Sequence, residues 1–147
     1  MIDRIDHVGI AVRSIEEARS FWEALGLRVE EIEEVPREGV RVAMIPCGGS
    51  RIELLEPTAE DSPIARFLDK QGPGIHHLCL GSDDVEADDA ALRGRGYRLI
   101  RERPTEGAGG SRMQFVHPKS AGGVLVELAQ AAGKAAGAAE TAGEEAP

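Results

Sequence analysis

Two histidines and two glutamates occur at matching points of two similar stretches of the chain. His7 stands in "RIDHVGIAV", and His77 stands in "GIHHLCLGS", 70 positions later. Glu53 in "GGSRIELL" and Glu127 in "GGVLVELA" each follow the second glycine by four residues. Two imidazoles and two carboxylates form a closed set of donors for one divalent ion of Zn, Co, Ni, Mn or Fe(II). The repetition therefore predicts a metal site whose ligands are His7, Glu53, His77 and Glu127.

The alternation of side chains along a strand indicates which way these residues point. Neighbouring strand residues face opposite sides of a sheet, so Glu53 points away from the apolar residues before and after it. Glu127 does the same in its own strand. A second histidine, His76, directly precedes His77. Because the repeat pairs His76 with Asp6, we expect His76 on the opposite face, as a supporting or surface residue.

The residues around these four describe one strand–helix–strand–strand–strand unit that occurs twice. In the first unit, "SIEEARSFWEALG" has a capping box at Ser14 and Glu17, apolar residues at helical spacing and a terminal glycine. The linker "DSPIARFLDKQGPG" predicts a short helix, because Asp61 or Ser62 can cap it and Pro63 suits its first turn. The expected strands are 4–12, 27–33, 40–46 and 51–56, then 75–80, 97–102, 112–117 and 124–129, with helices at 14–25 and 84–94.

Two such units would each expose one face of an open sheet, and packing them side by side would enclose a cleft. We therefore predict an α+β fold in which two βαβββ modules pair into a curved sheet around a metal-binding cleft. One domain, 1–130, would consist of module 1 at about 3–57, a connector helix within 58–73 and module 2 at about 74–130. The tail, 131–147, has no large apolar residue, so we predict that it is disordered.

The composition limits the partners that the protein can bind. Its 147 residues carry a net charge of -9, which argues against nonspecific binding to nucleic acids or membranes, since both attract basic surfaces. There is no apolar run of about 18 residues, so no transmembrane helix is expected. The N-terminus also lacks the residue order of a signal peptide. Cys47 and Cys79 show no zinc or redox spacing, so we expect two reduced thiols in a cytoplasmic protein.

The same residues carry a resemblance to a known family. Over roughly residues 3–130, the chain resembles the vicinal oxygen chelate superfamily and, within it, the methylmalonyl-CoA epimerases. The paired modules of that superfamily bind a metal in their cleft, so the resemblance implies ligands at His7, Glu53, His77 and Glu127. The family often has glutamine where this chain has Glu53, and bacterial glyoxalase I shares the ligand pattern found here. The motifs that carry the resemblance are "IDHVGIAV", "GGSRIELLEP", "DSPIARFL", "GIHHLCL", "HPKS" and "GVLVELAQ".

The resemblance implies interconversion of the (2R) and (2S) forms of methylmalonyl-CoA, within propionate metabolism. Removal of the α-proton places negative charge on the thioester oxygen, where a divalent metal acts as a Lewis acid. Glu127 is the candidate base. Some bacterial epimerases have a second carboxylate where this chain has Val42, so the second proton transfer is left to a water or to another residue. The resemblance also implies an acyl-CoA thioester as the bound partner, and a homodimer.

Coenzyme A carries phosphates, which local cations and hydroxyl groups would bind. The main candidates for contact with the substrate are Lys119 and Ser120 of the turn "HPKS", together with Arg112. Three further residues offer a charge or a hydroxyl donor: Arg51, Lys70 and Ser111. An acidic protein can still bind such an anionic ligand, because only a local basic pocket is required.

Three other functions use a similar fold. A lyase of the glyoxalase I type would share the metal and the ligand types, but "HPKS" and "DSPIARFL" argue against it. An iron-dependent extradiol dioxygenase typically uses two histidines and one glutamate, and a fourth ligand would occupy a position that oxygen chemistry needs open. A non-enzymatic small-molecule-binding protein of the same superfamily has no use for four inward-pointing metal ligands.

Overall fold

The first strands of the two modules, β1 (Ile2–Ala11) and β5 (Gly74–Ser82), lie side by side at the centre of one sheet. The computed structural model describes residues 1–133, so most of the tail predicted to be disordered lies outside the described residues. Module 1 continues with α1 (Ile15–Ala24), β2 (Glu31–Val35), the 3-10 turn η1 (Pro36–Glu38), β3 (Val40–Cys47) and β4 (Ser50–Pro57). After α2 (Pro63–Gln71), module 2 continues with α3 (Val85–Gly94), β6 (Thr105–Glu106), η2 (Ala108–Gly110), β7 (Arg112–Val116), η3 (Pro118–Ser120) and β8 (Val126–Gln130).

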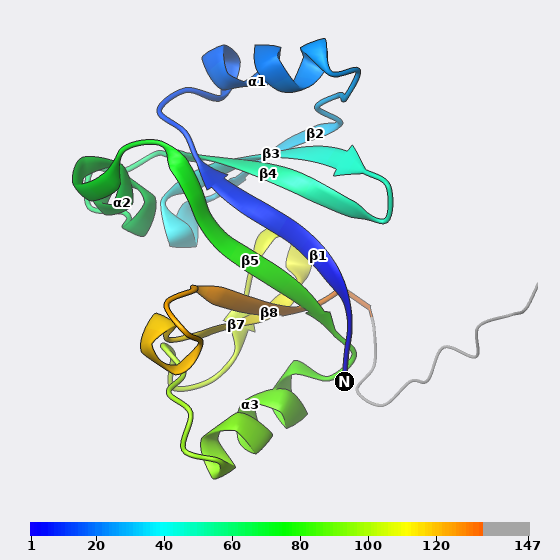
Figure 1. The fold of residues 1–147 in the computed structure, drawn as a ribbon, viewed down its shortest axis with the longest axis vertical. Coiled ribbons are helices and arrows are strands. Elements are labelled where there is room, and N and C mark those ends of the chain that lie inside the picture. The colour runs from blue at the N-terminus through cyan, green and yellow to red at the C-terminus, as the bar shows by residue number, and fades with distance from the viewer. Residues whose placement is uncertain (134–147) are drawn as a thin grey trace, which may run out of the picture.

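The eight strands form one sheet in the order β2-β3-β4-β1-β5-β8-β7-β6. The β1 and β5 strands pair antiparallel, and each also pairs in parallel with the last strand of its own module, β4 or β8. Figure 1 shows the two modules as the upper and lower halves of the ribbon, joined along β1 and β5. The predicted α+β fold, with two βαβββ modules in one curved sheet, is therefore confirmed.

Side chains cap the three helices at the predicted positions. Ser14 Oγ accepts a hydrogen bond from the Glu17 amide, Ser62 caps α2 in the same way, and Asp84 caps α3. Apolar side chains of α1 pack against β3 and β4, and those of α3 pack against β7 and β8. Because side chains alternate along these strands, the positions between the core residues are left to face the cleft. None of the helices in residues 1–133 is long and apolar enough to cross a membrane.

The prediction of a strand at 97–102 is wrong, because within the described residues this segment forms only an isolated bridge from Leu99. The cause is the buried side chain of Gln114 in β7, which takes the place of a neighbouring strand. Its Oε1 accepts a hydrogen bond from the Arg101 amide (3.3 Å), and its Nε2 donates one to the Arg101 carbonyl (3.0 Å). The edge strand of module 2 is instead the short β6, which follows this segment.

The strand predicted at 27–33 begins later, at Glu31. Leu27 and Val29 pack against the core cluster beneath α1, so this stretch follows the helix before it joins the edge of the sheet. The other strands and helices lie close to their expected positions.

Three register shifts interrupt the pairing of β1 with β5, one at the start of β1 and two beside the candidate ligand histidines. The register shifts between Ile5 and His7, which leaves Asp6 as an extra residue in β1. It shifts again at His76, which is the extra residue in β5. A bulge re-aims side chains, so that two successive residues can face the same side. Asp6 thus joins His7, and His76 joins His77, at equivalent points of the two modules.

Candidate metal centre

Three of the four predicted metal ligands meet in the cleft. His7 comes from β1, His77 from β5 and Glu127 from β8, and all three side chains are buried. The Nε2 atoms of the two histidines are 3.0 Å apart, and Oε2 of Glu127 lies 3.3 Å from Nε2 of His7 and 2.8 Å from Nε2 of His77. Donor atoms of the three residues all lie within 4.8 Å of one another. Two imidazole nitrogens and a carboxylate oxygen at such distances can converge on one divalent ion.

Glu53, the fourth predicted ligand, lies at the other side of the His7 ring. Its Oε2 is 3.0 Å from Nδ1 of His7, whereas Nε2 is the atom that faces His77. The Arg51 guanidinium holds the same oxygen, with 2.7 Å between Nε and Oε2. The structure therefore brings Glu53 to the edge of the ligand group, where it is buried, but not among the atoms that converge.

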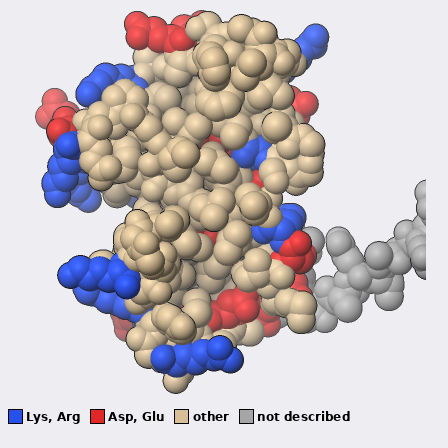
Figure 2. Space-filling model, in the orientation of Figure 1, with Lys and Arg blue, Asp and Glu red and all other residues tan. Residues whose placement is uncertain are grey.

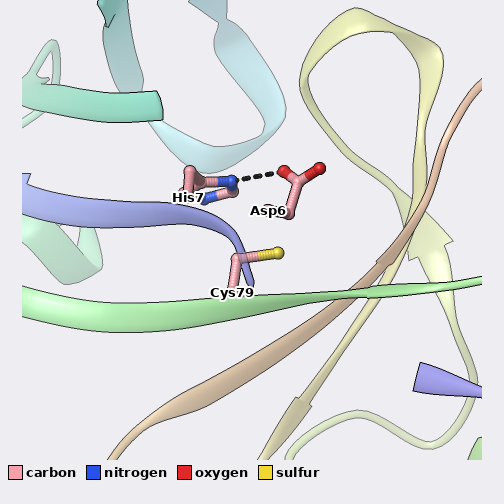
Figure 3. A group of neighbouring side chains, drawn as sticks. All are labelled: Asp6, His7 and Cys79. Atoms are coloured by element: carbon pink, nitrogen blue, oxygen red, sulfur yellow. Dashed lines mark hydrogen bonds and ion pairs between the residues drawn. The ribbon is translucent and has the colours of Figure 1, made fainter. Parts of the chain in front are cut away.

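Asp6 is a neighbour of His7 that the sequence did not single out as a site residue. Its Oδ2 accepts a hydrogen bond from Nδ1 of His7 at 2.7 Å, as Figure 3 shows. The same oxygen lies 3.0 Å from Arg51, and Oδ1 lies 3.1 Å from Arg4. The repeat held the signal for this role, because it pairs Asp6 with His76, the residue next to the other histidine.

The prediction that His76 faces the opposite side of the sheet is wrong. Its Nδ1 is 2.9 Å from Nδ1 of His77, and both side chains line the same cavity. The bulge in β5 is the reason, since strict alternation does not hold at an extra residue. Burial lowers the pKa of His76 to about 4, and the proximity of His77 acts in the same direction, so the His76 imidazole is neutral at physiological pH.

Small residues lie opposite both ligand histidines across the junction of β1 and β5. Gly9 pairs with His77, and Cys79 pairs with His7. A Cβ at Gly9 would come within 2.2 Å of the His77 ring. Figure 3 shows the Cys79 side chain beside His7 and Asp6, and burial raises the pKa of this thiol to about 12, which keeps it protonated. Both cysteines of the chain are free, as predicted.

Hydrogen bonds outweigh burial in setting the protonation states of His7 and Glu127. Burial alone would lower the pKa of His7, but hydrogen bonds with Asp6, Cys79 and Glu127 raise it to about 12. Burial would likewise raise the pKa of Glu127, but hydrogen bonds with both histidines lower it to about 2. At neutral pH, His7 is therefore an imidazolium and Glu127 is a carboxylate.

The charges around this group leave a place for a cation. The carboxylates of Asp6, Glu53 and Glu127 contribute three negative charges, and the guanidinium groups of Arg4 and Arg51 contribute two positive ones. The proton on the imidazolium balances the difference. A divalent ion can take the place of that proton, because metal binding requires a deprotonated imidazole and favours anionic oxygen ligands. The donor set therefore fits a bound metal.

Two cavities border the group, and both have Glu53 and Glu127 in their walls. One cavity, of about 210 Å³, has mainly apolar walls that include Val42, Leu55 and Phe115. The other, of about 250 Å³, is more polar, and its walls include Asp6, His7, Arg51 and Ser111. A ligand bound at the centre therefore meets an apolar and a polar surface.

Of the residues predicted to contact the substrate, Arg51 and Ser111 line the polar cavity, whereas the main candidates lie outside the walls of both cavities, as does Lys70. Lys119 is exposed, and Ser120 Oγ accepts a hydrogen bond from a backbone amide of a neighbouring loop. Arg112 is exposed and forms an ion pair with Glu86. Lys70 is also exposed, at the end of α2. The structure therefore does not bring the main candidates or Lys70 together with the ligand group.

An ion pair between the two modules also lines the apolar cavity. The NH2 group of Arg101 lies 2.7 and 2.9 Å from the two carboxylate oxygens of Glu38. The Arg101 guanidinium is 5.5 Å from the centre of the Phe115 ring, which in turn lies edge-on to His77. Sequence reasoning missed this pair, because its members are 63 positions apart and belong to different modules.

Comparisons with known proteins agree with this architecture. A sequence model of the Glyoxalase/Bleomycin resistance protein/Dioxygenase superfamily matches residues 6–115. The mitochondrial methylmalonyl-CoA epimerase of Homo sapiens is 42% identical over 132 residues, which cover 88% of this chain and 75% of that protein. The ethylmalonyl-CoA/methylmalonyl-CoA epimerase of Cereibacter sphaeroides is 41% identical over 133 residues, which cover 88% of this chain and 99% of that protein.

A solved structure gives the same result for the fold. A variant of Streptomyces coelicolor methylmalonyl-CoA epimerase, in complex with 2-nitronate-propionyl-CoA, superposes with a TM-score of 0.87 at 40% sequence identity. The match covers 91% of this chain and 98% of that one. From the family match, the identities and the shared fold, the chain belongs to the glyoxalase/bleomycin resistance protein/dioxygenase (vicinal oxygen chelate) superfamily and, within it, to the methylmalonyl-CoA epimerase family.

Proposed function

We propose that this protein is a metal-dependent epimerase that interconverts (2R)- and (2S)-methylmalonyl-CoA by abstraction of the α-proton. The observation that carries the proposal is the buried group of His7, His77 and Glu127 between the two modules. It occurs in a chain that is 42% identical, over 88% of its length, to a protein named as an epimerase of this substrate.

One divalent ion is part of the proposal, with His7, Glu53, His77 and Glu127 as its ligands and Co, Mn, Zn, Ni or Fe(II) as its identity. The convergence of two ring nitrogens and a carboxylate oxygen within 4.8 Å supports this assignment, as does the excess of carboxylates. Glu53 supports it less directly, through its burial beside His7. When bound, the ion would supply Lewis-acid stabilisation of the negative charge on the thioester oxygen.

Glu127 is the proposed base. Although burial raises its pKa, hydrogen bonds with the two histidines lower it to about 2, so the group is ionised and able to accept a proton. Both histidine contacts use Oε2, which leaves Oε1 to take the α-proton. Val42 lines the apolar cavity and cannot carry a proton. The proton that arrives from the opposite side must therefore come from water or from another group of the cleft.

The two cavities suit the two kinds of group on the α-carbon. The apolar walls around Val42, Leu55 and Phe115 match the methyl group, and the polar cavity beside Arg51 matches a carboxylate. Burial of these walls keeps water away and strengthens the electrostatic interactions of the developing charge. Contacts of coenzyme A with Lys119, Ser120 and Arg112 stay predictions.

The decisive experiment follows one epimer of methylmalonyl-CoA in D2O with the purified, metal-loaded protein. We expect conversion to the other epimer together with incorporation of deuterium at the α-carbon, because abstraction and return of the proton pass through solvent-exchangeable groups. Glu127→Gln should abolish both signals. If the metal-loaded protein shows no epimerisation and no deuterium exchange, the proposal is refuted.

The alternative functions predict other results in the same assays. A glyoxalase I-type lyase would isomerise the hemithioacetal of methylglyoxal and glutathione, and it would not exchange the α-proton of methylmalonyl-CoA. An extradiol dioxygenase would consume oxygen with a catechol. A non-enzymatic binding protein would retain its ligand after removal of the metal. We expect no meaningful turnover in the first two assays and no such metal-independent binding.

A homodimer also belongs to the proposal. Ile5 and Ile75 are 50% and 69% exposed on the two central strands, and Val124 is 46% exposed. Figure 2 shows a face on which charged side chains lie mainly towards the rim. Association of two copies would remove such apolar side chains from water. Light scattering coupled to size-exclusion chromatography would measure the oligomeric state directly. The cytoplasmic location stays a prediction.

A further inference from the structure

Asp6 contacts His7 because the backbone of β1 has a bulge at this residue. The bulge in β1 turns the Asp6 side chain to the side of its neighbour, where Oδ2 lies 2.7 Å from Nδ1 of His7. Asp6 is only 9% exposed, although it has a charged side chain. A buried carboxylate is costly without partners, so its position requires an explanation.

This contact, the shorter of two that carboxylates make with Nδ1 of His7, decides which nitrogen of His7 can bind a metal. A carboxylate only accepts hydrogen bonds, so Nδ1 must carry the hydrogen in the contact with Asp6. The other nitrogen, Nε2, is then the one available as a ligand, and it is the atom that lies 3.0 Å from His77 and 3.3 Å from Glu127. Histidines that bind metals commonly donate their second N–H to a carboxylate, which orients the ring and raises its basicity.

Arg51 holds Asp6 in this orientation and links it to a second predicted ligand. Its guanidinium lies 3.0 Å from Oδ2 of Asp6 and 2.7 Å from Oε2 of Glu53. Arg4 binds the remaining oxygen of Asp6, at 3.1 Å. Both oxygens of Asp6 are thus held, and the carboxylate has little freedom to turn away from the His7 ring.

The second histidine has a different support. His77 has the His76 imidazole at its Nδ1, 2.9 Å away, and no carboxylate contacts that atom in the described structure. Equivalent bulge residues therefore provide a charged partner in module 1 and a neutral one in module 2. The Nδ1 atom of His7 is therefore held by a carboxylate, whereas that of His77 faces a neutral imidazole.

We propose that Asp6, held by Arg51, is the positioning residue that fixes His7 as an Nε2 ligand of the metal. This inference rests on the proposed function, since it requires the metal site assigned there. Asp6 acts only through His7 and need not touch the substrate.

The test uses the full chain, stripped of metal with a chelator and titrated with Co²⁺ in competition with a chromophoric chelator. Asp6→Asn keeps the shape of the side chain but removes its charge. We expect Co²⁺ to bind about 10- to 100-fold more weakly, and we expect the visible absorption bands of the bound Co²⁺ to shift. Asp3→Asn is the matched control, because Asp3 pairs with the same Arg4 at an exposed position. It should bind Co²⁺ as the unmodified chain does.

A variant of a ligand separates failure of this inference from failure of the proposed function. If His77→Ala binds Co²⁺ as the unmodified chain does, the metal site itself is wrong. If His77→Ala loses Co²⁺ but Asp6→Asn keeps the original affinity and spectrum, only the positioning role is refuted. A lower melting temperature of Asp6→Asn at unchanged Co²⁺ affinity would show a purely structural role and would also refute it.

A measurement on the unmodified chain does not depend on the folding of any variant. In the Zn²⁺-loaded protein, the ¹⁵N chemical shifts of the His7 ring should show hydrogen on Nδ1 and metal on Nε2. The opposite assignment, with hydrogen on Nε2, would overturn the proposal.

Discussion

Gly9 of β1 pairs directly with His77 of β5, and a Cβ at position 9 would come within 2.2 Å of the imidazole ring. The missing side chain is therefore what lets the His77 ring lie over β1 and reach Glu127 and His7. The equivalent position of the second module holds Cys79, which pairs with His7. Both sides of the junction thus leave space for a ring, and this requirement is part of the site.

We predict that Gly9→Ala weakens metal binding. The added methyl group would overlap three atoms of the His77 ring, so the ring must leave its position beside Glu127. Metal affinity should fall at least about tenfold, and the free energy of unfolding should fall by about 1–3 kcal/mol, as for other overpacked sites. Metal titration and denaturant unfolding would measure the two effects. Gly74→Ala is the control, because a Cβ there meets nothing within 4 Å.

Alanine substitutions should separate the roles of the two adjacent histidines. His77→Ala removes the nitrogen that lies 2.8 Å from Glu127, so we expect almost no metal to remain after dialysis. His76→Ala removes only a neutral neighbour, so the metal should stay bound after the same dialysis. Metal analysis of the purified variants would decide. Loss of metal in His76→Ala and retention in His77→Ala would mean that the ligand register is one residue off.

Metal binding should tighten as the pH rises. Burial alone would lower the pKa of His7, but hydrogen bonds with Asp6, Cys79 and Glu127 raise it to about 12. In the metal-free protein, Nε2 of His7 therefore carries a proton that the metal must displace. Release of one proton strengthens apparent binding up to about tenfold per pH unit below that pKa. Calorimetric titration with Zn²⁺ at about pH 7 and 8, in buffers that differ in ionisation enthalpy, would count the proton. An affinity independent of pH would contradict the assigned protonation.

Replacement of Gln114 should destabilise the fold and spare the metal site. Gln114→Leu would leave the Arg101 amide without its side-chain acceptor, while the Arg101 carbonyl would keep Arg93 as a donor, and Asp89 would lose a hydrogen bond of 2.7 Å. Each buried group left unsatisfied costs about 1–3 kcal/mol. Chemical unfolding should show this loss, whereas Gln71→Leu at the exposed end of α2 should change little. A neutral effect of Gln114→Leu would mean that this segment finds other partners.

The sequence by itself determined the repeat of two βαβββ units, the helix caps and the residue types of the metal group. These features follow from local patterns, since strand alternation, capping residues and turn glycines act over a few positions. The equivalence of His7 with His77 is likewise visible in a single chain. The strand predicted at 97–102 failed because its partner is not local: the buried side chain of Gln114, from another strand, replaces a ladder of backbone hydrogen bonds there.

Only the tertiary structure decided how the side chains meet at the centre. The bulges that turn Asp6 and His76 to the cleft arise from the pairing of β1 with β5, and alternation within either strand predicts the opposite for His76. The tertiary structure also decided the place of Glu53, whose carboxylate lies at Nδ1 of His7 instead of among the converging atoms. The register between strands some 70 positions apart is decided by packing of the whole sheet. A shift of one residue there reverses the face of a side chain, so no local pattern could have settled it.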